Sequence, residues 1–418
     1  MIKSVIISIG DELLIGQTIN TNAAWLGQRL TNLGIKVVEI YTISDDYDAI
    51  HHALFEAEKT ADLIIITGGL GPTKDDITKK ALAEYFETEL VLNEEALENV
   101  RRIFAEKKHP LLDVNVKQAE VLANSEVLIN ELGTAPGMWI EKDNKYFIAL
   151  PGVPHEMKNL FDKKVELKIK NRLPLPFRYQ RIIHTIGIGE SALAEKLYSW
   201  ETRLRNDGLL LAYLPSPGIV KLRISIEGDS DSNISELKDI VEKYVSELQE
   251  IIPNYIFGYD NDTIESKIGE LLQKNQATLA TAESCTGGNL AHKITSVAGS
   301  SKYYKGTVVS YANEVKTQVL GVDINDLKEH GAVSQQVVEQ MAKGVKNLLK
   351  TDFAIATSGI AGPDGGTAEK PVGTVWIAAA SKDKVMSKKF RFSTDRMLNI
   401  ELASIMGMEM LRRLILNL

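Results

Sequence analysis

The chain has 418 residues, which at roughly 150 residues per domain allows two to three domains with separate cores. It carries 48 Lys and Arg against 56 Asp and Glu, a net charge of −8. This balance argues against a protein that mainly binds nucleic acid or an anionic membrane surface. One cysteine excludes an internal disulfide and a thiolate zinc cluster. Because no apolar stretch approaches the roughly 18 residues of a membrane span, we expect a cytoplasmic protein without a membrane partner.

The first block alternates short apolar strands with helical patterns. An apolar run at 4–9 ends in Gly10-Asp11-Glu12, and a strand at 63–66 runs into a glycine-rich turn at 67–71. A helix, a strand at 35–43 and a helix at 45–59 are predicted between them. This order predicts an open parallel sheet whose ligands bind beyond the carboxyl ends of its strands.

A linker-like Pro174-Leu175-Pro176 ends the first block. The middle block shows two strand–helix pairs, at 182–200 and 218–251. The third block alternates helix and strand again up to a last helix at 395–416. The expected class is α/β with three domains: two larger α/β sandwiches with mainly parallel sheets, at 1–172 and 257–418, flank a small α+β module at 177–253.

In the third block, the segment ATAESCTGG at 280–288 lies at a predicted strand-to-helix junction. Such a junction directs backbone N–H groups and the positive end of a helix at one point, which suits a phosphate or a developing oxyanion. The alternative is that Ser284 or Thr286 only caps the helix.

Two further segments of this block carry chemistry. If Asn313 caps a helix, Lys316 lies in its first turn, where the macrodipole lowers the pKa of the amine and favours a general base. The alternative is a surface lysine paired with a carboxylate. Glycines at 359–366 allow close backbone approach to a ligand, although such a connection can also be only a flexible loop.

Five motifs of this block resemble, in order and spacing, the C-terminal domain of the CinA (competence/damage-inducible) family, typified by the nicotinamide mononucleotide deamidase PncC: TAESCTGG, YANEVK, HGAVS, TSGIAGPDGG and KPVGTVW. The resemblance implies metal-free hydrolysis of the carboxamide of nicotinamide mononucleotide to nicotinate mononucleotide and ammonia. It assigns the nucleophile to Ser284, the base to Lys316 and a supporting hydroxyl to Tyr311, which relays a proton or orients the lysine.

These residue types are chemically consistent, because a serine hydroxyl needs a base and a neutral lysine can serve as one. We expect N–H groups at 286–288 to bind the oxyanion, and Arg396 with the loop at 359–366 to hold the ribose phosphate. For Arg396 an ordinary helix-surface charge is the alternative. Cys285 is a rival nucleophile, although a buried cysteine usually behaves as a small hydrophobe. The expected substrate-binding set here is Glu283, Thr286, Gly287, Gly288, Ser358, Gly359, Gly362 and Arg396.

Three motifs of the first block resemble the molybdopterin-binding fold of the MoaB and MogA proteins in its CinA form: GDEL at 10–13, TGGLGPTKDDIT at 67–78 and LPGVPHEM at 150–157. The resemblance implies a second site that hydrolyses ADP-ribose at its pyrophosphate with a divalent metal. The expected substrate-binding residues are Gly10, Asp11, Glu12, Thr67, Gly68, Gly69, Gly71, Asp75, Pro151 and Gly152.

The metal ligands expected for this second site are Asp76 and Glu156, with Asp11 as a further candidate. Carboxylates suit a hard or borderline cation that bridges pyrophosphate oxygens. The alternative is that Thr73 caps a helix and the acids of its first turn serve only the helix start. The amidase site requires no cofactor.

The middle block resembles a KH-type module. Its Gly187-Ile188-Gly189-Glu190 carries an acid and no flanking base on its carboxyl side, so we expect a structural role and no nucleic-acid binding. Both expected activities would recycle breakdown products of NAD, in pyridine nucleotide salvage. The alternatives are molybdopterin binding or a non-catalytic role in competence or DNA repair. The wide apolar surface of the last helix indicates deep burial or a subunit contact. We expect a homodimer, because twofold assemblies are the commonest.

Overall fold

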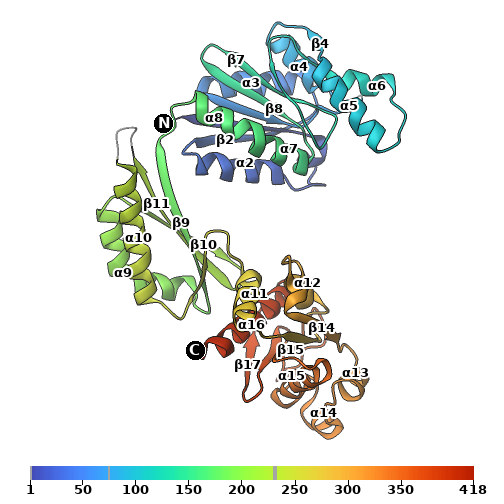
Figure 1. Cartoon of the computed structure of the whole chain (residues 1–418), viewed down its shortest axis with the longest axis vertical. Helices are drawn as coiled ribbons and strands as arrows, with labels where there is room; N and C mark the ends of the chain where they lie inside the picture. The colour runs from blue at the N-terminus through green and yellow to red at the C-terminus, as the bar shows by residue number, and fades with distance from the viewer. Residues whose placement is uncertain (1, 74–75, 229–232) are drawn as a thin grey trace. The chain divides into compact units, whose positions relative to one another are not determined.

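The computed structural model describes residues 2–73, 76–228 and 233–418. The chain forms two compact units, Met1–Arg178 with Glu227–Ile234, and Tyr179–Ile226 with Ser235–Leu418. The second unit contains the middle module and the C-terminal domain. Helices and strands alternate through both units (Figure 1), which confirms the α/β class.

The first unit is built on a six-stranded sheet in the order β2-β1-β3-β8-β7-β6. The first four strands of this order are parallel, and β7 and β6 are antiparallel to their neighbours, so the sheet is mixed. The parallel part matches the expected topology. The strands are β1 (Lys3–Ile9), β2 (Lys36–Ile43), β3 (Leu63–Thr67), β6 (Glu126–Leu128), β7 (Gly137–Lys142) and β8 (Lys145–Leu150).

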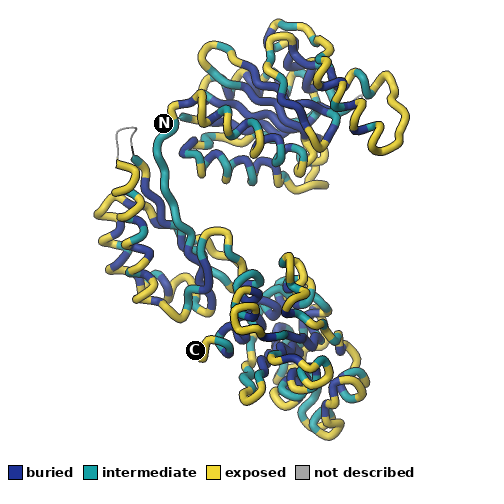
Figure 2. Tube along the Cα trace, viewed as in Figure 1, coloured by how far each residue is buried: buried dark blue, intermediate teal, exposed yellow. Residues whose placement is uncertain are grey.

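Alternate residues of β1 face two different cores, because side chains of a strand point to opposite faces. Val5 and Ile7 pack in the core that contains Leu54 of α3, whereas Ile6 packs with Leu26 of α2. Figure 2 shows the buried strands between half-buried helices. The helices are α1 (Asp11–Leu14), α2 (Thr21–Asn32), α3 (Tyr47–Thr60), α4 (Thr78–Tyr85), α5 (Glu94–Glu106), α6 (Asp113–Val116), α7 (Pro154–Leu160) and α8 (Glu166–Arg172), and a two-stranded ladder pairs β4 (Leu90–Leu92) with β5 (Glu120–Leu122).

The middle module is a four-stranded sheet in the order β10-β11-β9-β12. Its last strand corrects the expected boundary at 253, because β12 (Ile256–Tyr259) pairs antiparallel with β9 and so belongs to this module. The strand β10 (Leu210–Ser216) was not predicted. The other elements are β9 (Phe177–Ile186), α9 (Glu190–Asn206), β11 (Ile219–Gly228) and α10 (Ile234–Ile251).

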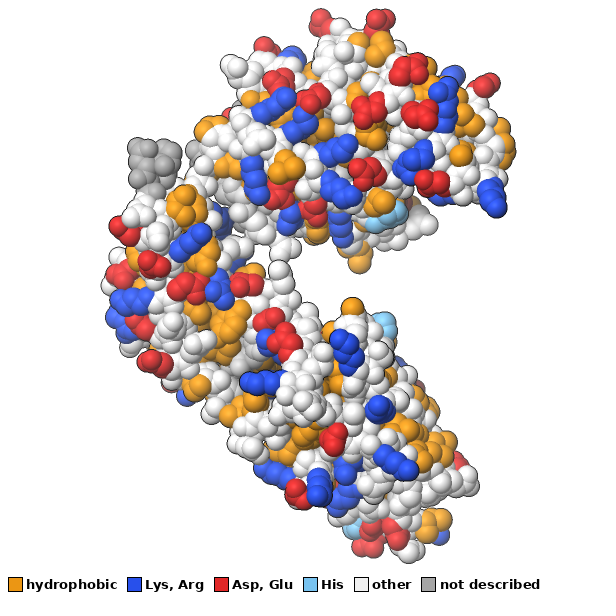
Figure 3. Space-filling view, viewed as in Figure 1, with side chains coloured by type: hydrophobic (Ala, Val, Ile, Leu, Met, Phe, Trp, Pro, Cys, Tyr) orange, Lys and Arg blue, Asp and Glu red, His pale blue; other side chains and the backbone are white. Residues whose placement is uncertain are grey.

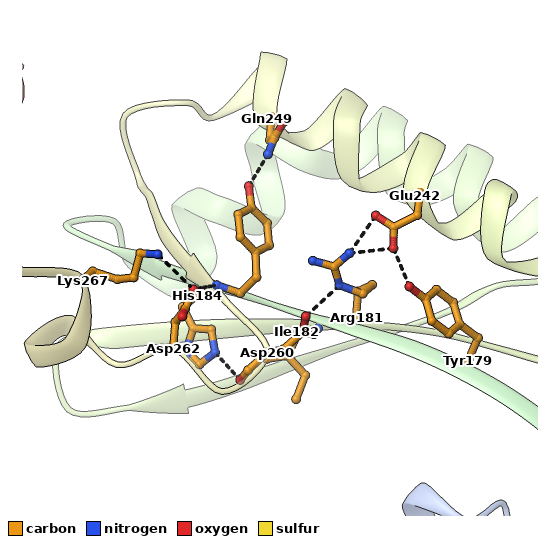
Figure 4. Close-up of polar contacts among 10 residues, drawn as sticks. Tyr179, Arg181, Ile182, His184, Glu242, Gln249, Asp260, Asp262 and Lys267 are labelled. Atoms are coloured by element: carbon orange, nitrogen blue, oxygen red, sulfur yellow. Dashed lines mark hydrogen bonds and ion pairs between the residues drawn. The ribbon is translucent and has the colours of Figure 1, made fainter. Parts of the chain in front are cut away.

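A polar network ties α10 and the segment after β12 to β9 (Figure 4). Arg181 donates to the two carboxylate oxygens of Glu242 at 2.6 and 2.7 Å, and its Nε lies 2.9 Å from Asp260. Tyr179 donates its hydroxyl to Glu242 at 2.6 Å. The ring of His184 donates to the carbonyl of Asp260 at 2.9 Å, and burial lowers the pKa of this histidine. These groups satisfy one another, which favours a structural role.

The C-terminal domain has a five-stranded sheet in the order β14-β13-β15-β16-β17. The first three strands are parallel and the last two antiparallel, so this sheet is less parallel than expected. Helix α15 covers one face, and α16 and α11 cover the other. The elements are α11 (Ile264–Lys274), β13 (Leu279–Glu283), α12 (Asn289–Thr295), β14 (Tyr304–Val309), α13 (Asn313–Gln318), α14 (Ile324–His330), α15 (Gln335–Leu349), β15 (Phe353–Gly359), β16 (Thr374–Ala380), β17 (Val385–Arg391) and α16 (Arg396–Leu416).

The surface carries both signs of charge. On the face shown in Figure 3, Lys and Arg side chains are interspersed with Asp and Glu. Across the described ranges, no helix combines the length and apolar character needed to cross a membrane.

Candidate functional site

Ser284 follows β13 directly, where the chain turns toward α12. Its backbone N–H donates to the carbonyl of Thr357 on β15 at 3.0 Å. Gly287 and Gly288 follow with φ of +59° and +104°, conformations that side chains other than glycine rarely adopt. The motif therefore fixes a serine hydroxyl at the carboxyl edge of the parallel strands.

Lys316 on α13 meets this serine. Its Nζ lies 3.2 Å from the Oγ of Ser284, 2.6 Å from the carbonyl oxygen of Ser310 and 3.3 Å from that of Tyr311. The side chain is 1% exposed, and burial lowers the pKa of the amine. The pKa is therefore lowered, as the sequence predicts. The cause is burial rather than the helix dipole, because α13 begins after Ala312 and has only six residues. The surroundings of Lys316 favour a neutral amine that can accept a proton from Ser284.

Glu283 has a different position from the one expected of a substrate ligand. It is fully buried, and its carboxylate accepts backbone N–H groups of Gly288 at 2.9 Å, Leu290 at 3.1 Å and Ala291 at 2.8 Å. The carboxylate thus holds the first turn of α12 against the end of β13. Glu283 positions the neighbouring Ser284 and has no free oxygen facing a substrate.

The same bonds revise the expected oxyanion donors. The N–H of Gly288 is taken by Glu283, and that of Gly287 donates to the carbonyl of Ser284 at 3.2 Å. Among the described residues, no acceptor is present for the N–H of Thr286. This N–H is therefore the member of the expected set that remains for an oxyanion.

Two hydroxyls expected to bind substrate are used within the chain. The Oγ1 of Thr286 lies 2.8 Å from the Oγ1 of Thr357, and the Oγ of Ser358 donates to the carbonyl of Ala332 at 2.7 Å. Both side chains are buried. They hold the strand ends and the segment 330–334 together around Ser284.

Tyr311 and Arg396 come together on the exposed side of this site. Arg396 donates from Nη1 to the carbonyl of Gly362 at 2.6 Å and from Nη2 to the hydroxyl of Tyr311 at 3.2 Å. Tyr311 is 63% exposed, and its contact with Lys316 is made by its carbonyl oxygen. The hydroxyl expected to act on Lys316 therefore contacts Arg396 instead.

The remaining expected residues shape the backbone. A Cβ at Gly359 would lie 2.6 Å from Val375 of β16, and Gly362 has φ of +95°. Cys285 is buried beside the serine, and burial raises the pKa of its thiol to about 12. A thiol protonated at neutral pH is a poor nucleophile, so the geometry favours Ser284 over Cys285.

In the first unit, the ends of β1 and β3 meet as the sequence predicts, and the end of the parallel strand β8 joins them. Gly68, with φ of +115°, follows β3 so closely that a Cβ there would lie 2.2 Å from the carbonyl oxygen of Ile9 on β1. A Cβ at Gly152 would lie 3.2 Å from the Cα of Gly68. The glycine turns after β1, β3 and β8 therefore form one edge.

A cavity of about 300 Å³ opens at this edge. Expected residues Glu12, Thr67 and Gly152 line it, and so do Asn20 and Asn22, which the sequence analysis missed. Asn22 donates to the carbonyl of Gly152 at 2.7 Å and to the Oγ1 of Thr67 at 3.2 Å, and its side-chain oxygen is buried without a partner among the described residues. Asn20 and Asn22 lie at the start of α2, beside the end of β1, and this position could have identified them from the sequence.

Acidic side chains lie around the glycine turn, and one of them was not expected. Asp45 accepts the backbone N–H of Asp11 at 3.2 Å, and burial together with the nearby carboxylates of Asp11, Glu12 and Asp76 raises its pKa. Asp45 follows β2 in sequence. Its place beyond a strand end could have identified it.

The expected metal ligands do not form a set. The carboxylate of Asp76 accepts the N–H of Gly71 at 2.9 Å and of Thr73 at 2.8 Å, and Glu156 accepts the side-chain amide of Asn130 at 2.7 Å. Both acids therefore hold loops. The helix-start alternative for Asp76 is wrong as well, because α4 begins at Thr78 with Ile77 as its N-cap, so Thr73 does not cap this helix. Asp75 lies outside the described residues. Within the described ranges no three His, Cys, Asp or Glu side chains are grouped to hold a metal, so the described residues do not fit one.

These features define a multi-domain α/β protein. Family models match three successive segments: "Probable molybdopterin binding domain" at residues 5–171, "Damage-inducible protein CinA KH domain" at 180–258 and "CinA C-terminal domain" at 261–415. The chain belongs to the CinA family, which confirms the resemblance found in its motifs.

Full-length relatives support this membership. The chain is 46% identical over 417 residues to a CinA-like protein of Flavobacterium psychrophilum, covering 99% of each chain. It is 42% identical over 412 residues to a CinA-like protein of Salinibacter ruber, covering 98% of this chain and 99% of that one. Among solved structures, the competence/damage inducible protein CihA from Agrobacterium tumefaciens is 37% identical, with a TM-score of 0.36, and covers 36% of this chain and 93% of its own.

Proposed function

We propose that the C-terminal domain hydrolyses the carboxamide of nicotinamide mononucleotide to nicotinate mononucleotide and ammonia. The observation that carries this proposal is the 3.2 Å contact between the Nζ of Lys316 and the Oγ of Ser284. A buried amine with a lowered pKa beside a serine hydroxyl is the pair that amide attack requires in the absence of histidine.

The reaction has two halves. The Oγ of Ser284 attacks the carboxamide carbon while neutral Lys316 takes the hydroxyl proton, and the N–H of Thr286 binds the oxyanion. When the tetrahedral intermediate collapses, the carbon–nitrogen bond breaks and the ammonium of Lys316 protonates the amide nitrogen, which leaves as ammonia. Water, deprotonated by Lys316, then attacks the ester, which releases the carboxylic acid and returns the proton to Ser284.

The phosphate end of the substrate is assigned to Arg396. Its guanidinium uses Nη1 and Nη2 to hold Gly362 and Tyr311, and a guanidinium has five N–H donors. The remaining donors can bind phosphate oxygens at the exposed mouth of the site.

The test is product formation from nicotinamide mononucleotide by the purified chain, with a Lys316→Met variant as the control. We expect ammonia and nicotinate mononucleotide in equal amounts from the wild type and neither from the variant. Equal rates from the two proteins would overturn the assignment of the base, and no product from either would overturn the activity.

A second candidate activity belongs to the first unit: hydrolysis of ADP-ribose to AMP and ribose 5-phosphate. The 300 Å³ cavity beside a glycine turn supports it, because backbone N–H groups of such a turn suit phosphates. No step is assigned to a metal, since the described carboxylates form no ligand set. The test is AMP release by the Ser284→Ala chain with Mg²⁺, Mn²⁺ or EDTA. No AMP under any condition would favour molybdopterin binding or a non-catalytic role.

A further inference from the structure

A cavity in the second unit lies away from Ser284. It has a volume of about 440 Å³ and is lined by Gly187, Tyr255, Met386, Ser387, Lys388, Phe390, Met406, Glu409, Met410 and Arg413. The lining of α16 begins at Met406, ten residues after Arg396 at the amidase site, which is about 15 Å along a helix. The cavity is therefore separate from the amidase site.

The walls of this cavity share one core. Ile186 and Phe257 of the middle module pack in the same apolar cluster as Leu411 and Leu414 of α16. Arg412 fixes the two parts further, because its Nη2 donates to the carbonyl of Asn254 at 2.9 Å. The shape of the cavity is thus set by packing.

The floor of the cavity is apolar and partly aromatic. Met386 and Phe390 project from β17 toward the core covered by α16, and Met406 and Met410 come from α16 itself. Tyr255 contributes a second ring. Flexible thioethers beside aromatic rings suit a planar ring, because methionine sulfur makes favourable contacts with aromatic groups.

The rim of the cavity is positively charged. Glu409 is 1% exposed and accepts from both Arg412 and Arg413, so this cluster retains one positive charge. Lys388 lies over the ring of Phe390 at 5.2 Å and forms no ion pair with the described residues. At the opening, a Cβ at Gly187 would lie 3.1 Å from the Nη2 of Arg413, so the glycine leaves this donor uncrowded.

We propose that this cavity binds a nucleoside monophosphate, with its base on the methionine and aromatic floor and its phosphate at Lys388 and Arg413. The volume lies within the range of about 300–1,000 Å³ typical of small-molecule sites. Two cations, one of them a guanidinium, suit a doubly charged phosphate better than a single carboxylate. The site is distinct from both sites described above.

The chain offers a matched pair of variants. Lys388→Glu reverses a charge on the cavity face of β17, whereas Lys389→Glu makes the same change at the next residue, whose side chain points to the opposite face of the strand. Both lysines are exposed, so both variants are expected to fold. We expect AMP binding, measured by calorimetry on the full chain, to weaken at least tenfold in Lys388→Glu and less than twofold in Lys389→Glu.

Photolabelling locates the site independently. With 8-azido-AMP, we expect the labelled peptides to contain residues 386–390 or 406–413, and excess AMP to suppress the label. The proposal would be overturned if the two variants bound AMP with equal affinity. It would also be overturned if the label were confined to residues 1–178 or to the Ser284 segment. Binding of the fatty acid dodecanoate without binding of AMP would overturn it too, because the cavity would then be a purely apolar site.

Discussion

The Nζ of Lys316 and the Oγ of Ser284 lie 3.2 Å apart although 32 positions separate them in the chain. Parallel pairing of β13 with β14 brings them together, because Ser284 follows the first strand and Lys316 lies on the helix after the second.

The rate of the amidase reaction should depend on pH through the protonation state of Lys316. Only the neutral amine accepts a proton, so kcat/KM for nicotinamide mononucleotide should rise with pH and level off below pH 10.5, the ordinary pKa of lysine. A rate that is flat from pH 6 to 10 would contradict this prediction.

The same amine makes stability depend on pH. Because burial lowers its folded pKa below the unfolded value, the folded chain binds fewer protons, and stability is reduced below the folded pKa and recovers as pH rises toward 10.5. Lys316→Met removes this dependence. We therefore expect the free energy of unfolding of Lys316→Met, measured by urea titration, to exceed that of the wild type by more at pH 6 than at pH 10. A difference that does not change with pH would show that the lysine is not perturbed.

Glu283 should matter for stability more than an exposed glutamate. Its carboxylate accepts three backbone N–H groups at the start of α12, and Glu283→Gln would direct a side-chain N–H toward one of these donors. Bonds to a charged acceptor contribute about 1.5–3 kcal/mol each, so we expect a loss of about 2 kcal/mol or more, together with lower amidase activity. The control is Glu401→Gln, which breaks a partly exposed pair with Lys293 and should cost less than about 1 kcal/mol.

Tyr311→Phe separates two roles of the tyrosine hydroxyl. If the hydroxyl mainly holds Arg396, the variant should raise KM for nicotinamide mononucleotide a few-fold and leave kcat nearly unchanged. Loss of a proton relay would instead lower kcat by about 100-fold or more.

Arg396→Gln should raise KM at least tenfold for the mononucleotide and leave KM for nicotinamide riboside, which lacks the phosphate, unchanged. Equal effects on both substrates would contradict a phosphate contact.

Two glycines in helices should respond to alanine in opposite ways. A Cβ at Gly344 of α15 would lie 2.0 Å from the carbonyl oxygen of Leu320, whereas nothing lies within 4 Å of one at Gly27 of α2. We expect Gly344→Ala to lower the free energy of unfolding by about 1–3 kcal/mol through overpacking. Gly27→Ala should raise it by about 0.5–1 kcal/mol, because alanine is the better helix former. Thermal unfolding of both variants measures this, and destabilisation by both would contradict it.

The sequence predicted what periodicity and strand ends determine. The apolar strand at 4–9, the turn at Gly68 and the strand before Ser284 all follow from local pattern. The antiparallel pairing of β16 and β17 was missed, although the segment 381–384 between them is too short for the crossover that parallel strands need. The strand β12 was assigned to the wrong module for another reason: its partner β9 lies about 70 residues earlier in the chain, and local pattern does not show such a pairing.

Roles of individual polar groups were harder to predict than their places. Glu283 and Asp76 lie where ligands were expected, yet their oxygens are used by backbone N–H groups. A motif gives the types and spacing of side chains. The hydrogen-bond partner of each side chain depends on which donors the folded chain leaves unsatisfied. Asn22 was missed because its amide meets Gly152 across 130 positions.

Ammonia release from nicotinamide mononucleotide in the presence of EDTA, by the wild type beside Ser284→Ala and Cys285→Ala, tests the central claim most directly. We expect the wild type and Cys285→Ala to release ammonia at similar rates and Ser284→Ala to release none, because the thiol is buried with its pKa raised to about 12 while the hydroxyl contacts Lys316. Activity that survives in Ser284→Ala, or that requires a metal, would contradict the serine–lysine amidase.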